Sequence, residues 1–446
     1  MARPSTRLTL SGQRFLTHRM ERAVAHGDIH ADDDSPRAQS VSMLLGVLLA
    51  LLALAGTAVF AVWRPPAELG DATVVMVRGT GALYVRVEDV YHPVLNLTSA
   101  RLIAATGEKP RQVAEAAVRR VKTGALLGIP GAPTIIGPPL VESESAWTVC
   151  DDATTTVIAG PPAEMAAAGA AVLAAGPSGT PYLLYDGHRA RVDLTDPVVL
   201  RVLGIEGRQP APVSRALLDL VPEVPPITAP RIPGVGTPGP AALPGFLIGE
   251  VVRIHQASGT EFFVVLAGGV QQVGEVAADI IRYSGPSAAV TAVAPSLVNR
   301  LPRLGTLAVQ SFPQHVGTIG GADVGTVCAS WTAGSIEILL GVRSPGPRRV
   351  QLAQADGAGP RTDAVELPAG RSAYVRAEGT QAPVGALVTE HGVRFPLGDT
   401  ESARILGLPR TPAAAPRAVL EALPLGPVLT RSAALTAYDA VPAGSR

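Results

Sequence analysis

The chain has 446 residues, enough for roughly two to four folded units, and its 37 basic residues are balanced by 37 acidic residues. Only 17% of the residues are charged and 47% are hydrophobic, which excludes a disordered polyampholyte. The balanced charge also argues against a nucleic-acid-binding protein, because such a protein needs a clustered excess of Lys and Arg to neutralise phosphates.

The first 40 residues are predicted to form a tail that contains one amphipathic helix. Ser11 is its predicted N-cap, and Leu16 and Met20 fall on one face of the helix. Two interpretations stay open: the helix lies on an anionic inner leaflet, or it docks to a cytosolic partner. For the second interpretation, the candidate contact residues are Arg14, Phe15, Leu16, Arg19 and Met20.

A single apolar run follows, from Val41 to Trp63, and no charged residue lies between Arg37 and Arg64. As a helix the run would be about 34 Å long, enough to cross a hydrocarbon core of ~30 Å. A soluble core helix is disfavoured because the run is apolar on all faces, and a cleaved signal peptide because a long charged tail precedes it. The sequence predicts an uncleaved anchor, with the short Arg-rich tail inside and the long C-terminal part exported.

The chain has two cysteines, Cys150 and Cys328, both after the predicted anchor. An exported protein with one structural disulfide would show this minimal, even number. The alternative is two unrelated buried thiols. Metal binding is disfavoured, because the chain has no CxxC motif and its histidines are scattered.

A pattern recurs four times in the exported part: a short apolar strand, a tight turn, a second strand and the start of a helix. Asp186-Gly187 and Gly268-Gly269 suit tight hairpins, because glycine readily supplies a positive φ. The copies occupy residues 83–103, 182–204, 262–281 and 386–407. Each is predicted to be a β-hairpin followed by a helix, and the uneven spacing disfavours a solenoid.

Two of the gaps between copies each contain a Trp and a Cys: Trp147 with Cys150, and Cys328 with Trp331. We infer that these gaps form the two halves of one discontinuous β-rich domain, joined by the disulfide. Between the second and third copies, the stretch 222–244 has eight prolines and is predicted to be an exposed spacer in polyproline II form. The resulting order is nearly palindromic and predicts an elongated body with a pseudo-twofold axis.

Motifs for catalysis or cofactor binding are absent from the sequence or lack their usual context. Lys109 and Lys122 are the only lysines, and neither follows a glycine, so the chain has no phosphate-binding loop. Residues 234–239 match GxGxxG but lie in the proline-rich stretch, with no predicted strand before them and no helix after them. The pair Asp151-Asp152 is interpreted as a solvated loop rather than a carboxylate pair. The sequence predicts no catalytic residue, no metal site and no cofactor.

Two stretches carry a resemblance to a known family: the N-terminal MARPSTRL with SGQRFL, and VYHPVLNLTSARL at residues 90–102. With the single anchor and the Trp/Cys gaps, they resemble the EccB family, a core component of the type VII (ESX) secretion system of mycobacteria and related actinomycetes. The resemblance covers essentially the whole chain. It implies an α+β protein with a single transmembrane helix and an elongated periplasmic body of four hairpin–helix repeats around a disulfide-linked central β domain.

The resemblance also implies a function and a set of partners. The expected protein is a single-pass subunit of the inner membrane, with a cytoplasmic N-terminus and a periplasmic body that organises the secretion complex. The expected partners are EccC, EccD, EccE and the mycosin protease, with self-association and contact with the lipid bilayer, and no nucleic acid. Two alternatives remain: an ATPase, as the family is labelled, which the motifs do not support, and a peptidoglycan-binding anchor that uses the repeats.

The predicted domains follow from this organisation. After the tail (1–40) and the transmembrane helix (41–63), they are repeat 1 (72–130), the first central half (131–180), repeat 2 (181–221), the proline-rich linker (222–245), repeat 3 (246–303), the second central half (304–380), repeat 4 (381–430) and a C-terminal tail (431–446).

Overall fold

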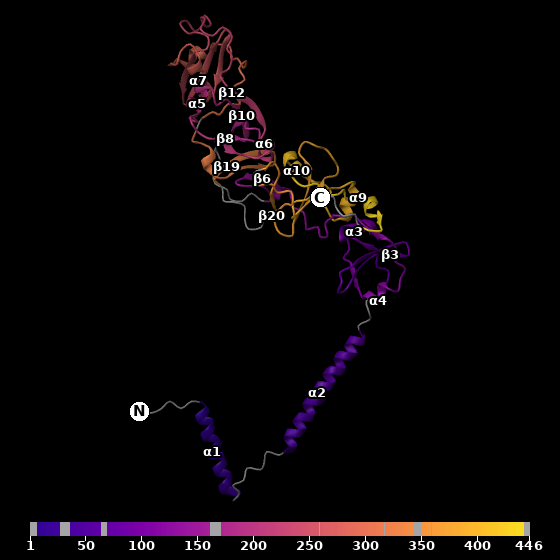
Figure 1. Cartoon of the computed structure of the whole chain (residues 1–446). Helices are drawn as coiled ribbons and strands as arrows, with labels where there is room; N and C mark the ends of the chain where they lie inside the picture. The colour runs from indigo at the N-terminus through magenta and orange to yellow at the C-terminus, as the bar shows by residue number, and fades with distance from the viewer. Residues whose placement is uncertain are drawn as a thin grey trace, which may run out of the picture. The chain divides into compact units, whose positions relative to one another are not determined.

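The computed structural model describes residues 7–26, 36–63, 69–160, 171–257, 259–315, 317–341, 349–357 and 359–440. The chain divides into two compact units, Met1–Glu68 and Leu69–Arg446. The first contains two helices, α1 (Arg7–His26) and α2 (Pro36–Trp63) (Figure 1). Among the described residues, Ser40–Thr57 within α2 is the stretch long and apolar enough to cross a membrane. The predicted N-cap is wrong, because α1 begins four residues before Ser11.

The second unit contains four repeats with one topology. Each has a three-stranded antiparallel meander, a helix, a fourth strand parallel to the first, and a short helix. Repeat 1 comprises β1 (Val74–Val77), β2 (Leu83–Val87), β3 (Val90–Val94), α3 (Leu97–Ala104), β4 (Arg111–Val113) and α4 (Glu115–Val118). Repeat 2 comprises β8 (Ala171–Ala175), β9 (Pro181–Tyr185), β10 (His188–Val192), α5 (Pro197–Leu203), β11 (Ala211–Pro212) and α6 (Arg215–Leu220).

Repeats 3 and 4 have the same elements in the same order. Repeat 3 comprises β13 (Val251–Gln256), β14 (Gly259–Leu266), β15 (Gly269–Val273), α7 (Glu275–Ser284), β16 (Val290–Ala292) and α8 (Pro295–Val298). Repeat 4 comprises β22 (Ser372–Ala377), β23 (Ala386–Thr389), β24 (Arg394–Pro396), α9 (Thr400–Ile405), β25 (Ala413–Ala415) and α10 (Arg417–Ala422). The four predicted hairpins and the helices after them are therefore confirmed.

The long helix of three repeats starts from a side-chain N-cap at the same place. Asn96, Asp196 and Asp399 accept hydrogen bonds from the backbone N–H groups of Ser99, Val198 and Ser402, at 2.9, 2.9 and 2.6 Å. Each bond satisfies one of the amide groups that the first helical turn leaves without a partner. Repeat 3 has Gly274 at this place instead.

After each short helix, the chain returns to pair with the third strand of its repeat. The backbone N–H groups of Tyr91, Arg189, Val270 and Arg394 donate to the carbonyls of Lys122, Pro222, Pro302 and Pro424, at 2.9, 2.9, 3.0 and 2.9 Å. Proline suits the accepting position, because only its carbonyl is needed there. In repeats 1 and 2 the pairing continues as β5 (Leu126–Leu127) and β12 (Glu223–Ile227).

The central sheet is built from both halves of the chain. Its strand order is β19-β18-β6-β7-β21-β20. The first half gives β6 (Ala146–Asp151) and β7 (Thr155–Ala159), and the second gives β18 (Val327–Thr332), β19 (Ser335–Leu340), β20 (Val350–Gln351) and β21 (Ala364–Glu366). The short elements η1 (Glu142–Glu144), η2 (Ala322–Val324) and β17 (Ile319–Gly320) lie in the connections, and β17 pairs with β8.

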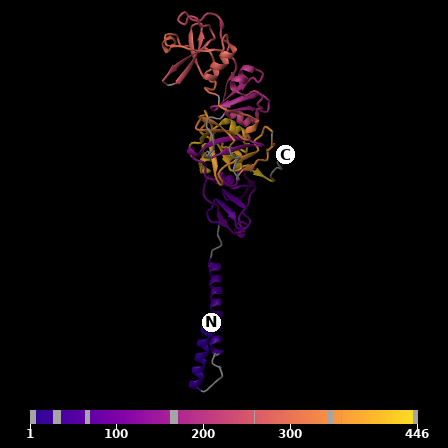
Figure 2. The same ribbon diagram turned by 90° about the vertical axis from the view of Figure 1, so that its left-hand side faces the viewer.

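Three of the predicted domain boundaries need correction. Strands β8 and β22 lie in the predicted central halves but pair within the sheets of repeats 2 and 4. The predicted C-terminal tail contains α11 (Arg431–Ala434) and β26 (Ala437–Tyr438), and β26 pairs with β5 of repeat 1. In Figures 1 and 2 the yellow C-terminal ribbon accordingly lies beside the purple strands of repeat 1.

The predicted exposed spacer is also wrong in part. Residues Glu223–Ile227 form the edge strand β12, and the side chains of Ile227 and Leu243 are buried. An edge strand tolerates proline, because one side of its backbone needs no ladder partner. Pro225 and Pro226 therefore did not prevent this stretch from joining a sheet.

The cores show how the repeats pack. Repeats 1 and 4 share one core around Leu102 and Ile405, and repeats 2 and 3 share another around Leu203 and Ile281. The long helix of each repeat covers one face of its sheet, and the opposite face is its second face. In repeats 2 and 4 the second face packs against the central sheet through α6 and α10. Repeats 1 and 3 instead cover the second face with their own short helices, α4 and α8, through Val118 and Val298.

Candidate functional site

The centre of the second unit is a sheet that the disulfide closes. Cys150 on β6 and Cys328 on β18 lie directly opposite each other and are bonded, although 178 residues separate them in sequence. Both cysteines are buried, and the predicted pairing is confirmed. A loop of this length corresponds to roughly 4–5 kcal/mol of lost entropy in the unfolded chain. The bond therefore joins the two halves where their strands already pair.

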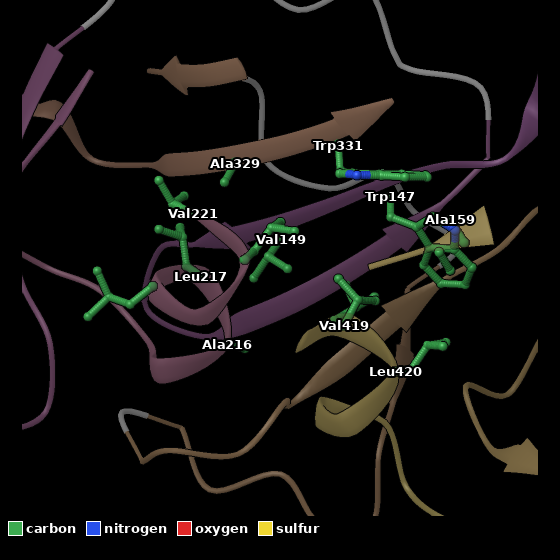
Figure 3. Close-up of a cluster of buried hydrophobic side chains, with 14 of the residues drawn as sticks. Trp147, Val149, Ala159, Ala216, Leu217, Val221, Ala329, Trp331, Val419 and Leu420 are labelled. Atoms are coloured by element: carbon green, nitrogen blue, oxygen red, sulfur yellow. The ribbon is translucent and has the colours of Figure 1, made fainter. Parts of the chain in front are cut away.

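A tryptophan pair links the central sheet to repeat 4. Trp147 and Trp331 lie opposite each other on β6 and β18. The indole N–H of Trp331 donates to a carboxylate oxygen of Glu378, at 3.1 Å, just beyond the end of β22. Both indoles belong to the core that also contains Val419 and Leu420 of α10, as Figure 3 shows. Apolar packing and a charge-assisted hydrogen bond thus hold repeat 4 on the sheet.

Asp151 links the other end of β6 to repeat 2. One of its carboxylate oxygens accepts a hydrogen bond of 2.6 Å from the backbone N–H of Ser214. The Ser214 hydroxyl in turn caps α6 by accepting from the N–H of Leu217 at 3.1 Å. Burial raises the pKa of Asp151 to about 6, because the charged form loses its hydration. The other carboxylate oxygen has no partner among the described residues.

The interpretation of Asp151-Asp152 as a solvated loop is therefore wrong for Asp151, whose side chain is only 5% exposed at the end of a central strand. Asp152 lies in the turn after β6, and its carboxylate accepts from the N–H and the hydroxyl of Thr154 at 2.8 and 3.0 Å. The two neighbours thus have different structural roles. Nothing brings them together as a catalytic pair.

Two hairpin turns dock on opposite parts of the central sheet. Gly187, between β9 and β10, has φ +73° and approaches β19 so closely that a Cβ would lie 2.3 Å from the carbonyl oxygen of Ile336. Gly392, just before β24, has φ +76°, and a Cβ there would lie 2.6 Å from a methyl group of Val365 on β21. Both turns need glycine for the backbone conformation and for the space. Repeats 2 and 4 thus contact the sheet in matching ways.

The five candidate partner residues of the tail all lie on α1. Phe15, Leu16 and Met20 are 67%, 55% and 70% exposed, and Arg14 and Arg19 are exposed as well. Leu16 and Met20 are four residues apart and lie on one side of the helix. Such a stripe of exposed apolar side chains on a charged helix is typical of a surface that binds a partner or a membrane.

The glycine-rich motif at residues 234–239 has no free cradle for a phosphate. The backbone N–H groups of Gly236 and Gly239 donate to the carbonyls of Ile248 and Phe246, at 2.9 and 2.8 Å. A dinucleotide site would direct such amides at the pyrophosphate from the start of a helix. Here they bond to the loop that precedes the first strand of repeat 3.

Several histidines bond to nearby groups of the chain. His92 and His188 contact the backbone carbonyls of Ala125 and Asp186, at 2.9 and 2.7 Å, and His315 contacts a carboxylate oxygen of Glu275 at 2.7 Å. Within the described ranges, no group of three or more His, Cys, Asp or Glu side chains is arranged to hold a metal ion.

Comparison with known proteins gives consistent matches along the chain. A family model described as "Type VII secretion system ESX-1, transport TM domain B" matches residues 2–443. The "ESX-3 secretion system ATPase EccB3" of Mycolicibacterium smegmatis is 35% identical, covering 98% of this chain and 91% of the relative. The "ESX-5 secretion system ATPase EccB5" of Mycobacterium tuberculosis is 31% identical over 98% of this chain and 94% of its own length.

Solved structures match over the same length. A chain of an intact ESX-5 inner membrane complex has a TM-score of 0.73 and 30% identity, with 100% of this chain and 98% of that chain covered. A chain of an EccB3 dimer from the ESX-3 core complex has a TM-score of 0.70 and 31% identity, with 82% of this chain and 100% of that chain covered.

Proposed function

The chain belongs to the EccB family, and we propose that it is a structural subunit of a type VII (ESX) secretion complex in the inner membrane. In this proposal α2 spans the membrane once, α1 lies in the cytoplasm, and the second unit lies on the periplasmic side. The observation that carries the proposal is the match, over the whole chain, to a subunit of a solved ESX inner membrane complex.

Two features of the chain support this orientation. The first 40 residues have six arginines and no lysine, and a basic segment next to a membrane helix tends to stay in the cytoplasm. The disulfide between Cys150 and Cys328 suits an oxidising compartment outside the cytoplasm, where thiols are not kept reduced.

The packing supports a structural role for the second unit. Every repeat shares a core with another repeat, and two of them also share the core of the central sheet. A body joined in this way keeps its surfaces in a fixed arrangement, as an organising subunit requires. We propose that these surfaces contact a second copy of the chain and the other subunits of the complex, namely EccC, EccD, EccE and the mycosin protease.

We further propose that α1 docks to a cytosolic part of this complex through Arg14, Phe15, Leu16, Arg19 and Met20. The exposed apolar stripe would enter a groove of the partner, while the arginines would pair with its acidic groups. Replacing Leu16 and Met20 by Ser should release the partner while α2 stays in the membrane. If cross-linking then shows α1 against lipid in both proteins, the helix is a membrane-surface helix instead.

The printed names of several relatives contain the word ATPase, so hydrolysis of a nucleotide is a second candidate function. The bonded amides of residues 234–239 argue against a nucleotide site at the one glycine-rich motif. Purified full-length protein should show no saturable ATP turnover above that of a mock purification. Turnover that a single substitution abolishes would establish the enzyme.

Affinity purification from native membranes in a mild detergent tests the main proposal. The tagged full-length chain should bring down the other membrane subunits in constant proportion. As a control, a tagged variant in which an unrelated transmembrane helix replaces α2 shows how much of the recovery depends on this anchor. Recovery of the chain alone, from membranes that contain all subunits, would overturn the proposed function.

A further inference from the structure

Repeat 1 follows the membrane helix after a short stretch of sequence. Five residues, 64–68, separate the last residue of α2, Trp63, from Leu69 at the start of the second unit. Even a fully extended chain of this length reaches only about 20 Å. If α2 spans the membrane, as the proposed function requires, Leu69 must therefore lie near the lipid headgroups.

Leu69 belongs to the face of repeat 1 that carries α4. Its side chain packs against the small core that includes Val113 and Val118, and Val121 packs against the same core. The guanidinium of Arg111 donates to the carbonyl oxygen of Leu69 at 3.3 Å. The chain thus enters the second unit beside β4, α4 and the residues that follow α4.

This face is strongly basic. Between residues 109 and 122 the chain has one acidic residue, Glu115, and five basic residues, all of them exposed: Lys109, Arg111, Arg119, Arg120 and Lys122. The only two lysines of the chain are among them. Glu115 is paired with Arg119 at 2.6 Å, so it offsets one of the positive charges. The nearby acids Asp71 and Glu108 are also exposed.

Repeat 3 has only part of this charge at the matching positions. The carbonyls of Lys122 in repeat 1 and Pro302 in repeat 3 accept the same backbone hydrogen bond from the third strand, so these two residues match. Arg300 then matches Arg120. Another basic residue of repeat 3, Arg303, lies over the ring of Phe263 at 4.3 Å and donates to Asn299. In repeat 3, therefore, part of the positive charge is used within the repeat.

We propose that the surface formed by Arg111, Arg119, Arg120 and Lys122 binds the headgroups of anionic phospholipids in the periplasmic leaflet of the membrane. The short connection holds these residues within reach of the headgroups, and their charge is complementary to lipid phosphate. Each Lys or Arg near an anionic surface strengthens binding about fivefold, and salt screens the attraction. The contact would fix the orientation of repeat 1 relative to the membrane surface.

Hydrogen exchange of the full-length chain in nanodiscs tests this inference. The two lipid compositions are pure phosphatidylcholine, and phosphatidylcholine with phosphatidylglycerol as the anionic lipid. We expect the amides of residues 109–124 to exchange about five- to tenfold more slowly with the anionic lipid, and the difference to vanish at high salt. The paired substitution Arg120→Gln with Lys122→Gln should remove most of this protection.

The matched control is Arg253→Gln with Arg300→Gln, which removes two exposed positive charges from repeat 3. It should leave the protection of residues 109–124 unchanged. Equal exchange in both lipids, or equal loss of protection in both variants, would overturn the inference. Failure of the chain to insert into nanodiscs through α2 would instead contradict the proposed function, so the two failures are distinguishable.

Discussion

Repeats 2 and 4 share a topology with repeats 1 and 3 but differ in what covers the second face of the sheet. In repeats 2 and 4 this face packs on the central sheet, whereas in repeats 1 and 3 it is covered by the short helix of the repeat itself. One position follows this division. This position lies two residues before the carbonyl that accepts a hydrogen bond from the third strand of each repeat. It is occupied by Leu220 and Ala422 in repeats 2 and 4, and by Arg120 and Arg300 in repeats 1 and 3.

One repeat topology therefore serves two purposes. All four repeats have the same strand pairing and the same long helix on one face of the sheet, so these features define the fold. The short helix decides the neighbour, because an apolar residue at this position permits burial, whereas an arginine keeps the surface in water. The division can be tested by changing residues on each side of it.

The largest effect on stability should come from replacing Leu220 of repeat 2 by the arginine that repeats 1 and 3 have at this position. Leu220 is 5% exposed in the core shared with the central sheet, so Leu220→Arg would bury a charge with no partner. We expect a loss of about 4 kcal/mol or more in the free energy of unfolding, measured by chemical denaturation. The control Arg300→Leu should change stability by less than about 0.5 kcal/mol. Similar losses in the two variants would refute the division.

Removing the disulfide should be the next largest effect, because the central sheet joins segments far apart in sequence. Cys150→Ser with Cys328→Ser should lower the free energy of unfolding by about 3–4 kcal/mol. On electrophoresis without reductant, the wild-type monomer should migrate faster than after reduction, and the variant should not change. A dimer band that reductant removes would show that the cysteines pair between chains.

Docking of the repeat 2 hairpin on the central sheet should contribute less. Gly187→Ala would introduce strain at φ +73° and a clash with the carbonyl of Ile336, for a cost of about 2–3 kcal/mol. Gly179→Ala is the matched control, because Gly179 has φ +76° and no neighbouring atom within 4 Å of a built Cβ. It should cost only about 1 kcal/mol in the same denaturation experiment. Equal costs would mean that the turn does not dock.

The smallest effect concerns the link from Asp151 to Ser214. Burial raises the pKa of Asp151 to about 6, so the folded protein binds a proton there more tightly than the unfolded chain does. Its contribution to stability is therefore present at low pH and is lost as the pH rises through about 6.

Between pH 7.5 and pH 5 this carboxyl should add about 1–2 kcal/mol to the free energy of unfolding. Asp151→Asn should flatten that part of the pH profile, since the amide oxygen can still accept from Ser214. Asp152→Asn should keep the slope. A pH profile of Asp151→Asn identical to that of the wild type would contradict the burial of this carboxylate.

The sequence predicted the parts of the fold that repeat with a clear pattern. The four hairpins and their long helices were visible because alternating apolar residues, turn glycines and N-cap residues agree there. The fourth strands were missed because β4, β11, β16 and β25 have only two or three residues each, too few for a periodicity. The first strands β8 and β22 were assigned to the central halves, because strand pairing is set by tertiary contacts.

The candidate sites were predicted unevenly for a similar reason. The disulfide followed from two cysteines on one side of an anchor, and the weakness of the glycine-rich motif followed from its prolines. The burial of Asp151 was missed, because a pair of aspartates usually marks a solvated turn and only the return of Ser214 to the end of β6 covers one of them. The role of Gly187 and Gly392 could be seen only once the neighbours of the turns were known.

In the proposed function, one membrane helix holds the disulfide-linked body outside the cytoplasm as part of the secretion complex. Alkaline phosphatase, which is active only after export, tests it most directly when fused after Arg446 in the full-length chain. This fusion should be active, and a matched fusion before Met1 should be inactive. An inactive C-terminal fusion that is stably produced, together with an active N-terminal one, would rule out this topology.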